Sequence, residues 1–280
     1  MKKIILIILF SVYANAQDLW WFYDNDYQPE TLAFQMRIIN NGGTISAPTL
    51  KAVDDFVKDV ATIRTKLLRV NLICGDGLTA TQIPLFFNTN MSSTAEGKTK
   101  DSLISFVGAD YSEANGLRCA TTPKHIQTGL NPSTTATLGL NDVHIGIYIA
   151  NNVAITQPVM GNANTLIYAR YTDNKTYYRV NVSGDVTSSA STDSRGFWVI
   201  SRLLNTTSIA YRNATQLTSN ASNSVAEANT QFIVGGSLVS NGSNTLLRGY
   251  TIGTGLTPAE ITLLNTAIEK FNDALGRGVQ

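Results

Sequence analysis

Hydrolysis of a glycosidic bond requires two acidic side chains flanking the bond, and the sequence offers few glutamates for that role. No two acids alternate along a predicted strand, and no Glu-x-Asp-x-x-Glu run occurs. Glu260 belongs to a helix start, and Glu269 lies on the polar side of the same helix. The glutamates are Glu30, Glu96, Glu113, Glu227, Glu260 and Glu269. The sequence therefore predicts no paired-carboxylate active site.

Nucleophiles and bases are equally sparse. The chain has no Gly-x-Ser-x-Gly turn and no phosphate-binding glycine loop with its lysine. Asp142 and His144 alternate on a predicted strand, so they share a face and are a candidate acid–base pair. Because no nucleophile lies nearby, the favoured interpretation of His144 is a hydrogen-bonded strand residue. We therefore expect a protein that is not an enzyme.

Cys74 and Cys119 are the two cysteines of the chain, and both lie among apolar residues. An isolated pair forms one disulfide in an oxidising compartment, whereas two buried free thiols suit the same surroundings equally well. Both alternatives stay open. His125 and His144 lack the spacing of zinc ligands relative to these cysteines, so no zinc site is predicted.

Three tryptophans are weak candidates for ligand binding. Trp20 and Trp21 lie in the aromatic run 18–27, and Trp198 lies in a predicted strand. Aromatic faces stack on the C–H surfaces of sugars, but aromatic residues also dominate protein cores. For the run 18–27 we favour a strand packed on the core.

Acidic turns offer weak candidate ligands for Ca²⁺, the one cofactor that the sequence suggests. Asp24, Asp26 and Asp173 combine carboxylates with neighbouring Asn residues, as calcium-binding loops of sandwich proteins do. Clusters of Asp and Asn in turns more often form Asx-turns, which is the favoured interpretation.

The N-terminus has the order of a secretory signal peptide. Lys2 and Lys3 precede an apolar run over residues 4–10, and Ala14-Asn15-Ala16 is a small-residue cleavage pattern. We expect cleavage after Ala16 and an exported or extracellular mature protein. The alternative is an apolar N-terminal strand or anchor that is retained. No other segment is apolar enough to span a membrane.

Composition narrows the class of protein further. The 280 residues are 43% hydrophobic, which is enough for one large core. Charged residues make up only 15% and the net charge is +1, so no broad field favours nucleic acid or anionic lipid. Asn, Thr, Ser and Gly fill the polar positions, as is typical of exposed extracellular or particle surfaces.

Two helices and many short strands are predicted. Apolar residues at helical spacing indicate a helix over 49–64, preceded by Ser46 and Pro48 as start signals. Thr257-Pro258-Ala259-Glu260 is a capping box that starts a C-terminal amphipathic helix, ended by Gly276. The predicted strands are 67–74, 103–107, 116–120, 143–150, 165–171, 176–182, 197–204, 208–212, 231–239 and 246–252.

These elements predict a mostly β protein, with two antiparallel sheets packed as a sandwich of the concanavalin A-like (jelly-roll) type. One helix falls in the N-terminal half and one at the C-terminus. The predicted organisation is a signal peptide or apolar segment over 1–16, a strand, helix and loop region over 17–100, and the sandwich with its helix over 101–280.

Two segments resemble concanavalin A-like, or laminin-G-like, domains. Residues 249–261 are similar to the closing strand of that family and its Leu-Ser/Thr-x-x-Glu-Ile helix start. Residues 208–213 are similar to the strand and turn around a Tyr-x-Asn-Gly motif, with Ala214 in place of the glycine. This resemblance implies a lectin-like sandwich and no catalytic residue.

A wider resemblance is to structural proteins of tailed phages and prophages of Bacteroidota. The similar segments are 53–60, 65–73, 115–120, 130–134, 140–144 and 256–279. The resemblance implies a non-enzymatic virion structural or attachment protein, whose partners are its own copies or other virion and surface proteins. The alternative is a secreted bacterial protein that binds cell-surface glycans, and a polysaccharide hydrolase or lyase is the least favoured.

Overall fold

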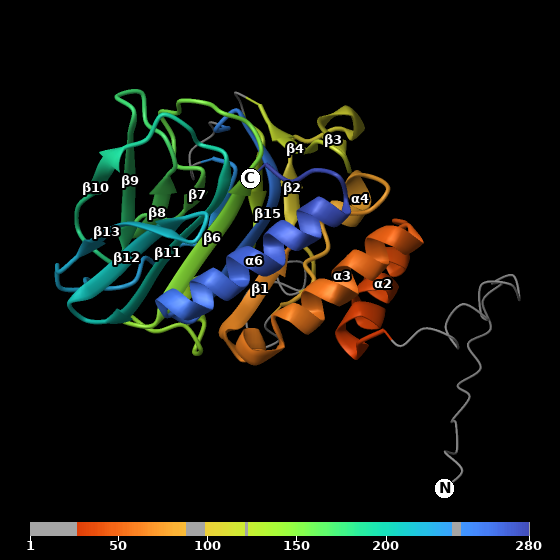
Figure 1. Ribbon diagram of the computed structural model, residues 1–280, viewed down its shortest axis with the longest axis horizontal. Coiled ribbons are helices and arrows are strands. Elements are labelled where there is room, and N and C mark those ends of the chain that lie inside the picture. Colours follow the sequence, from red (N-terminus) through yellow and green to blue (C-terminus); the bar gives the residue numbers. More distant parts are fainter. Residues whose placement is uncertain (1–26, 88–98, 121–122, 237–241, 280) are drawn as a thin grey trace, which may run out of the picture.

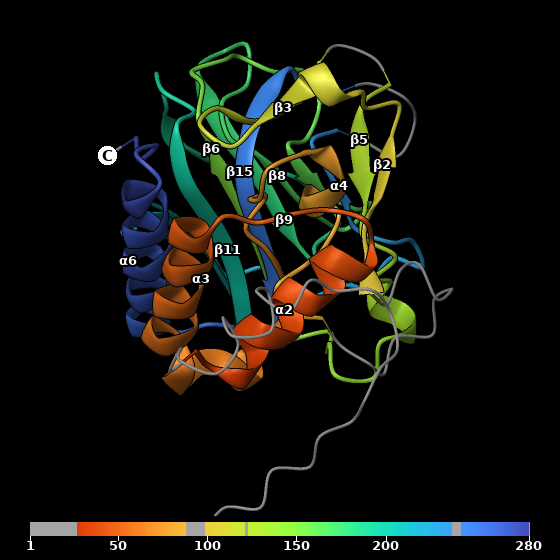
Figure 2. The same cartoon turned by 90° about the vertical axis from the view of Figure 1, so that its right-hand side faces the viewer.

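The computed structural model describes residues 27–87, 99–120, 123–236 and 242–279. Two antiparallel sheets pack face to face, and a layer of helices covers one of them, so the chain forms three layers (Figure 2). The predicted mostly β, two-sheet sandwich is confirmed. Within the described residues, no helix is long and apolar enough to cross a membrane.

The eight-stranded sheet, called sheet A, has β15 and β6 at its centre. β15 pairs with β6 along one edge, while its other edge pairs with β4 and then with β1. In spatial order its strands are β13 (Thr215–Asn220), β12 (Thr207–Arg212), β11 (Gly196–Leu204), β6 (Val143–Ile149), β15 (Thr245–Gly253), β4 (Gly116–Cys119) and β3 (Tyr111–Ser112), with β1 (Leu67–Asn71) beside β15.

The seven-stranded sheet B lies behind sheet A in the view of Figure 1. Its strands are β10 (Val186–Ala190), β9 (Lys175–Val180), β8 (Thr165–Tyr168), β7 (Met160–Gly161), β14 (Ile233–Val234), β5 (His125–Gln127) and β2 (Ser102–Ile104), in spatial order. The pairs given by the strand register are all antiparallel.

The central strands β6 and β11 of sheet A are buried on both faces, because they separate two apolar cores. Ile147 and Trp198 face sheet B, where they join the core between the sheets. Tyr148 and Phe197, their sequence neighbours, face the helices. Alternate residues of these two strands thus enter different cores, and β6 is buried along its whole length.

The helical layer rests on sheet A through the second core. Its α-helices are α2 (Pro29–Asn40), α3 (Ala47–Asp59), α4 (Leu78–Thr81) and α6 (Pro258–Ala274), and the 3₁₀ turns of the chain are η1 (Ala61–Lys66), η2 (Gly108–Asp110) and η3 (Pro132–Thr134). The helix predicted over 49–64 is α3 followed by η1, with Ser46 as its N-cap. The C-terminal capping box is confirmed, since Glu260 accepts from the Thr257 amide at 2.8 Å and Thr257 Oγ1 accepts from the Glu260 amide. α2 and α4 were not predicted.

A buried ion pair joins β1 to the segment that leads into β2. Arg69 Nη2 lies 2.6 Å from Asp101 Oδ1, and both side chains are fully buried. The Tyr250 hydroxyl, on β15, donates to the same carboxylate at 2.7 Å and accepts from Arg69 Nε at 3.0 Å. Position 100 is the predicted boundary between the N-terminal region and the sandwich. Residues before and after it therefore contribute to the same sheet and to the same polar network.

Candidate functional site

The two outer faces of the sandwich differ in their cover. Helices α3 and α6 pack on the outer face of sheet A, as Figures 1 and 2 show from two sides. No helix of the described chain lies on the outer face of sheet B (Figure 2). Any strand face that is free to contact a ligand is therefore the outer face of sheet B.

Three tyrosines gather on that outer face, and we call Tyr168, Tyr171 and Tyr177 the tyrosine cluster. Tyr168 of β8 and Tyr177 of β9 are partners in register, so they share one face. The rings of Tyr168 and Tyr171 lie 5.8 Å apart at 86°, and those of Tyr171 and Tyr177 lie 5.5 Å apart at 81°. All are partly exposed, whereas Tyr178, on the opposite face of β9, is fully buried between the sheets.

A tight hairpin turn places the third tyrosine. The Tyr171 amide donates to the Lys175 carbonyl at 2.7 Å, and the Asn174 amide donates to the Tyr171 carbonyl at 2.9 Å. Asn174 has φ of 60°, in the left-handed region that asparagine tolerates. The turn expected at Asp173-Asn174-Lys175 is thus present, and it folds Tyr171 back beside the strand tyrosines.

Polar groups flank the cluster on two sides. The Tyr177 hydroxyl donates to Asp173 Oδ2 at 2.7 Å, and the Lys175 amide donates to Asp173 Oδ1 at 3.1 Å. Arg179, which shares the face of Tyr177, donates through Nε to Asp185 Oδ1 at 2.6 Å. The cluster therefore combines flat apolar rings with a few fixed hydrogen-bonding groups, the composition of a small-ligand site.

Two carboxylates raise the pKa of the strand tyrosines. The hydrogen bond to Asp173 is the main cause of the raised pKa of Tyr177, and the charge of Asp185 adds to it. Burial raises the pKa of Tyr168 first, and the charge of Asp185 acts in the same direction. The hydroxyls of Tyr168 and Tyr177 therefore stay protonated at neutral pH.

The predicted aromatic site residues do not form this surface. Trp198 is 1% exposed, and its indole N–H donates to the Ser194 carbonyl at 2.8 Å. The prediction that Trp198 binds a ligand is therefore wrong, because its ring fills the core between the sheets. Trp20 and Trp21 lie outside the described residues.

Of the three candidate calcium ligands, Asp173 lies within the described residues. Asp24 and Asp26 lie outside the described residues. Asp173 forms the Asx-turn with Lys175 that was the favoured interpretation. The described residues include no group of three or more His, Cys, Asp or Glu side chains that could hold a metal ion.

Cys74 and Cys119 are free thiols, so the disulfide alternative is wrong. Cys74 lies in the core beneath the helices, and Cys119 lies in the core between the sheets. Burial raises the pKa of Cys74 to about 12 and that of Cys119 well above its usual range. Neither thiol is therefore activated as a nucleophile.

Asp142 and His144 do not form an acid–base pair. Asp142 Oδ1 accepts from the Gly255 amide at 2.6 Å, while His144 Nδ1 lies 2.6 Å from the Thr254 carbonyl. Both side chains thus fasten β6 to the chain between β15 and α6. His144 is fully buried, which agrees with its interpretation as a hydrogen-bonded strand residue.

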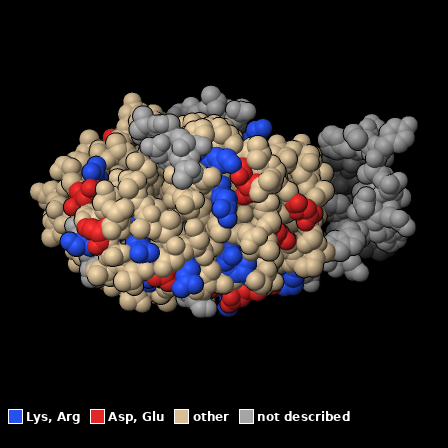
Figure 3. Space-filling view, turned by 90° about the horizontal axis from the view of Figure 1, so that it is seen from above, with Lys and Arg blue, Asp and Glu red and all other residues tan. Residues whose placement is uncertain are grey.

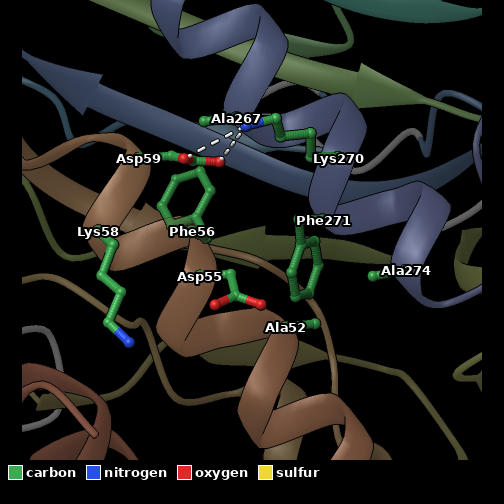
Figure 4. A pocket seen from close by; sticks show the side chains of 9 residues that line it. All are labelled: Ala52, Asp55, Phe56, Lys58, Asp59, Ala267, Lys270, Phe271 and Ala274. Atoms are coloured by element: carbon green, nitrogen blue, oxygen red, sulfur yellow. Dashed lines mark hydrogen bonds and ion pairs between the residues drawn. The ribbon is translucent and has the colours of Figure 1, made fainter. Parts of the chain in front are cut away.

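A concave surface, with a volume of about 330 Å³, lies between α3 and α6 (Figure 4). Its floor is formed by Phe56 and Phe271, whose rings meet edge to face at 6.4 Å. Lys270 and Asp59 bridge its rim at 3.1 Å, as the dashed lines in Figure 4 show. Both rings are buried in the helix–sheet core, so this groove is explained by helix packing, and the charged side chains that line it (Asp55, Lys58, Asp59 and Lys270) are in ion pairs.

The sequence carries a signal for the tyrosine cluster that no motif marks. Tyr168 and Tyr177 each lie in one of two predicted strands, 165–171 and 176–182, that are joined by a short turn, and the observed register pairs them across this hairpin. Which sheet face the helices cover cannot be read from that spacing.

The fold is a jelly-roll-like β-sandwich, and among the described residues the helices cover the outer face of only one sheet. No family model and no curated protein matches the sequence. Among solved structures, a Trypanosoma rangeli sialidase in complex with 2,3-difluorosialic acid matches at 9% identity and a TM-score of 0.51, over 78% of this chain and 38% of that chain. Domain 4 of AbnA, a GH43 extracellular arabinanase from Geobacillus stearothermophilus in complex with arabinotriose, matches at 17% identity and a TM-score of 0.37, over 51% of this chain and 72% of that chain.

The match to the sialidase shows the sandwich fold, and it corrects the expected function. The chain spans little more than a third of the sialidase chain, so the activity of the whole enzyme does not transfer. The matched structure is a sialidase and not a virion component. The prediction of a virion structural or attachment protein is therefore wrong.

Proposed function

We propose that this chain is a non-catalytic glycan-binding module of the concanavalin A-like, laminin-G-like kind. The observation that carries the proposal is the tyrosine cluster, which lies partly exposed on the sheet face that the helices leave uncovered. Tyrosine rings offer flat apolar area at low entropic cost, and they stack on the C–H faces of sugars. Asp173 and Arg179 supply the hydrogen-bonding groups that orient a sugar on such rings.

Electrostatics favour a glycan over a nucleic acid as the partner. Single-stranded nucleic acids also stack on aromatic rings, but their sites combine those rings with a positively charged groove. Here carboxylates flank the cluster, and Arg179 is paired with Asp185. Figure 3 shows acidic and basic side chains scattered among uncharged ones on another face of the described chain, in keeping with the net charge of +1.

The polar groups at the cluster also support binding without catalysis. Asp173 is held by the Tyr177 hydroxyl and the Lys175 amide, and Asp185 is held by Arg179. A glycosidase needs one protonated acid and one free carboxylate or base on opposite sides of the bond. Carboxylates fixed in these hydrogen bonds suit recognition of hydroxyl groups better than proton transfer.

We further propose that the protein is exported, with cleavage of the N-terminal segment after Ala16. The order of charge, apolar run and small residues supports this proposal. Intact-mass and N-terminal sequencing of natively produced protein test it. A mature chain that starts at Gln17 supports export, and a chain that retains Met1 contradicts it.

A glycan array followed by calorimetry on its best ligand tests the binding proposal. We expect Tyr177→Ala and Tyr168→Ala each to weaken binding about tenfold, or ~1.4 kcal/mol, because each removes one stacking face. Tyr177→Phe keeps the ring and so retains most of the affinity. Tyr27→Ala is the matched control, because Tyr27 is a partly exposed tyrosine just before α2.

The proposal fails if the array shows no binding above background. It also fails if binding occurs but Tyr177→Ala and Tyr27→Ala leave the same affinity. Circular dichroism and thermal unfolding of each variant exclude loss of fold as the cause of lost binding.

A further inference from the structure

The hydroxyl of Tyr177 has a fixed hydrogen-bonding direction. It donates its proton to Asp173 Oδ2 at 2.7 Å, so toward a ligand its oxygen can only accept. Asp173 itself is an acceptor, and the Lys175 amide at 3.1 Å holds it in place. This side of the tyrosine cluster therefore presents acceptors to a bound molecule.

The charged groups beside the rings are paired, so the fixed hydrogen-bond acceptors decide which ligands are preferred. Asp173 accepts from the Tyr177 hydroxyl, and Asp185 pairs with Arg179 at 2.6 Å. Lys175 Nζ is 3.9 Å from Asp173, and Arg170 donates to the side-chain oxygens of Asn152 and Asn174.

We infer that the tyrosine cluster takes neutral, hydroxyl-rich glycans and discriminates against sugars that carry a carboxylate or sulfate. The inference rests on the proposed glycan-binding function. A sugar hydroxyl donates to Asp173 and to the Tyr177 oxygen, whereas a carboxylate or a sulfate has no proton to donate to either acceptor. Asp173 is then a specificity-determining residue, acting directly and through Tyr177.

Substitution of Asp173 by asparagine reverses the direction of the hydrogen bond between residue 173 and the Tyr177 hydroxyl. The carboxamide that Asp173→Asn introduces can donate to the Tyr177 oxygen, which frees the tyrosine proton to point at a ligand. The hydroxyl then becomes a donor, and one negative charge is lost. Asp173→Asn is therefore expected to weaken neutral ligands and to strengthen acidic ones.

The experiment measures Kd for matched hexasaccharides, neutral and carboxylated at C6, in the β-1,4-linked gluco and manno series and the α-1,4-linked galacto series. For the native chain, the neutral hexasaccharide of the series that binds should bind about tenfold more tightly than its carboxylated counterpart. Asp173→Asn should reduce the difference several-fold. Asp55→Asn is the matched control, since Asp55 is an exposed, ion-paired acid on the helical layer.

Two failures are distinguishable. If no glycan binds in the array or in these series, the proposed function itself is refuted, and this inference falls with it. If glycans bind and Tyr177→Ala weakens them, but the carboxylated member binds as tightly as the neutral one, only the inference about ligand class is overturned. If the ratio of the Kd values for the neutral and carboxylated ligands is the same in Asp173→Asn as in the native chain, Asp173 does not determine the preference.

Discussion

The buried imidazole of His144 makes the stability of this protein depend on pH between 4 and 6.5. His144 is fully buried, and its Nδ1 lies 2.6 Å from the Thr254 carbonyl. Burial lowers the pKa of His144 to about 4, against the partly opposing effect of that hydrogen bond. In the unfolded chain the imidazole has an ordinary pKa of about 6.5.

The sign of the effect follows from proton binding. Below about pH 6.5 the unfolded chain binds a proton that the folded chain refuses until near pH 4, so acidification favours unfolding. The contribution is fully present above pH 6.5 and is lost as the pH falls toward 4. Since one pKa unit corresponds to ~1.4 kcal/mol, the loss between pH 7 and pH 5 is about 2 kcal/mol.

His144→Asn isolates this titration, because the asparagine amide can donate to the Thr254 carbonyl in place of Nδ1 and does not titrate. Urea unfolding at pH 7, 6 and 5 gives the free energy of unfolding for both proteins. The native chain should lose about 2 kcal/mol more than the variant over this range. Parallel losses in the two proteins would refute the reasoning. The depressed pKa values of Asp54, Asp110, Asp193 and Glu260 act mainly at lower pH.

Further predictions concern the buried polar groups and one cap. Asp101→Ala leaves the guanidinium of Arg69 buried without its carboxylate, so urea unfolding should show a loss of about 3–5 kcal/mol. Cys74 and Cys119 should resist a thiol reagent in the native state and react in full after denaturation; reaction of the native protein at the rate of free cysteine would contradict their burial. Thr257→Ala should lower the free energy of unfolding by about 1 kcal/mol through loss of the capping box, whereas Thr262→Ala, an exposed control on the same helix, should change it much less.

Local signals predicted those elements whose causes are local. The capping box at Thr257 and the apolar spacing after it define α6, and Ser46 with Pro48 defines the start of α3. α2 escaped prediction because its buried stripe is sparse. Only Thr31, Phe34 and Ile38 are buried in its twelve residues, and no side chain caps its start.

The site residues depended on non-local information. Every residue from Gly196 to Arg202 in β11 is buried, because one face meets sheet B and the other meets the helices. No alternation of polar and apolar residues therefore marks which face of the strand is exposed, and Trp198 could not be assigned to the core from its sequence. The tyrosine cluster was not predicted, because its exposure depends on which sheet the helices cover and the local sequence does not indicate that.

The location of the tyrosine cluster has an energetic consequence for the proposed glycan binding. Tyr168 and Tyr177 sit on paired strands, and the hydrogen bonds of the turn tie the backbone of Tyr171 to Asn174 and Lys175. Tyr177 is also held by Asp173, so the rings and the acceptors are in place before a ligand arrives. A site on a loop loses conformational entropy when it orders around a sugar, and this site avoids most of that loss. The helical layer, by covering sheet A, leaves sheet B as the rigid face on which such a preorganised surface can remain exposed.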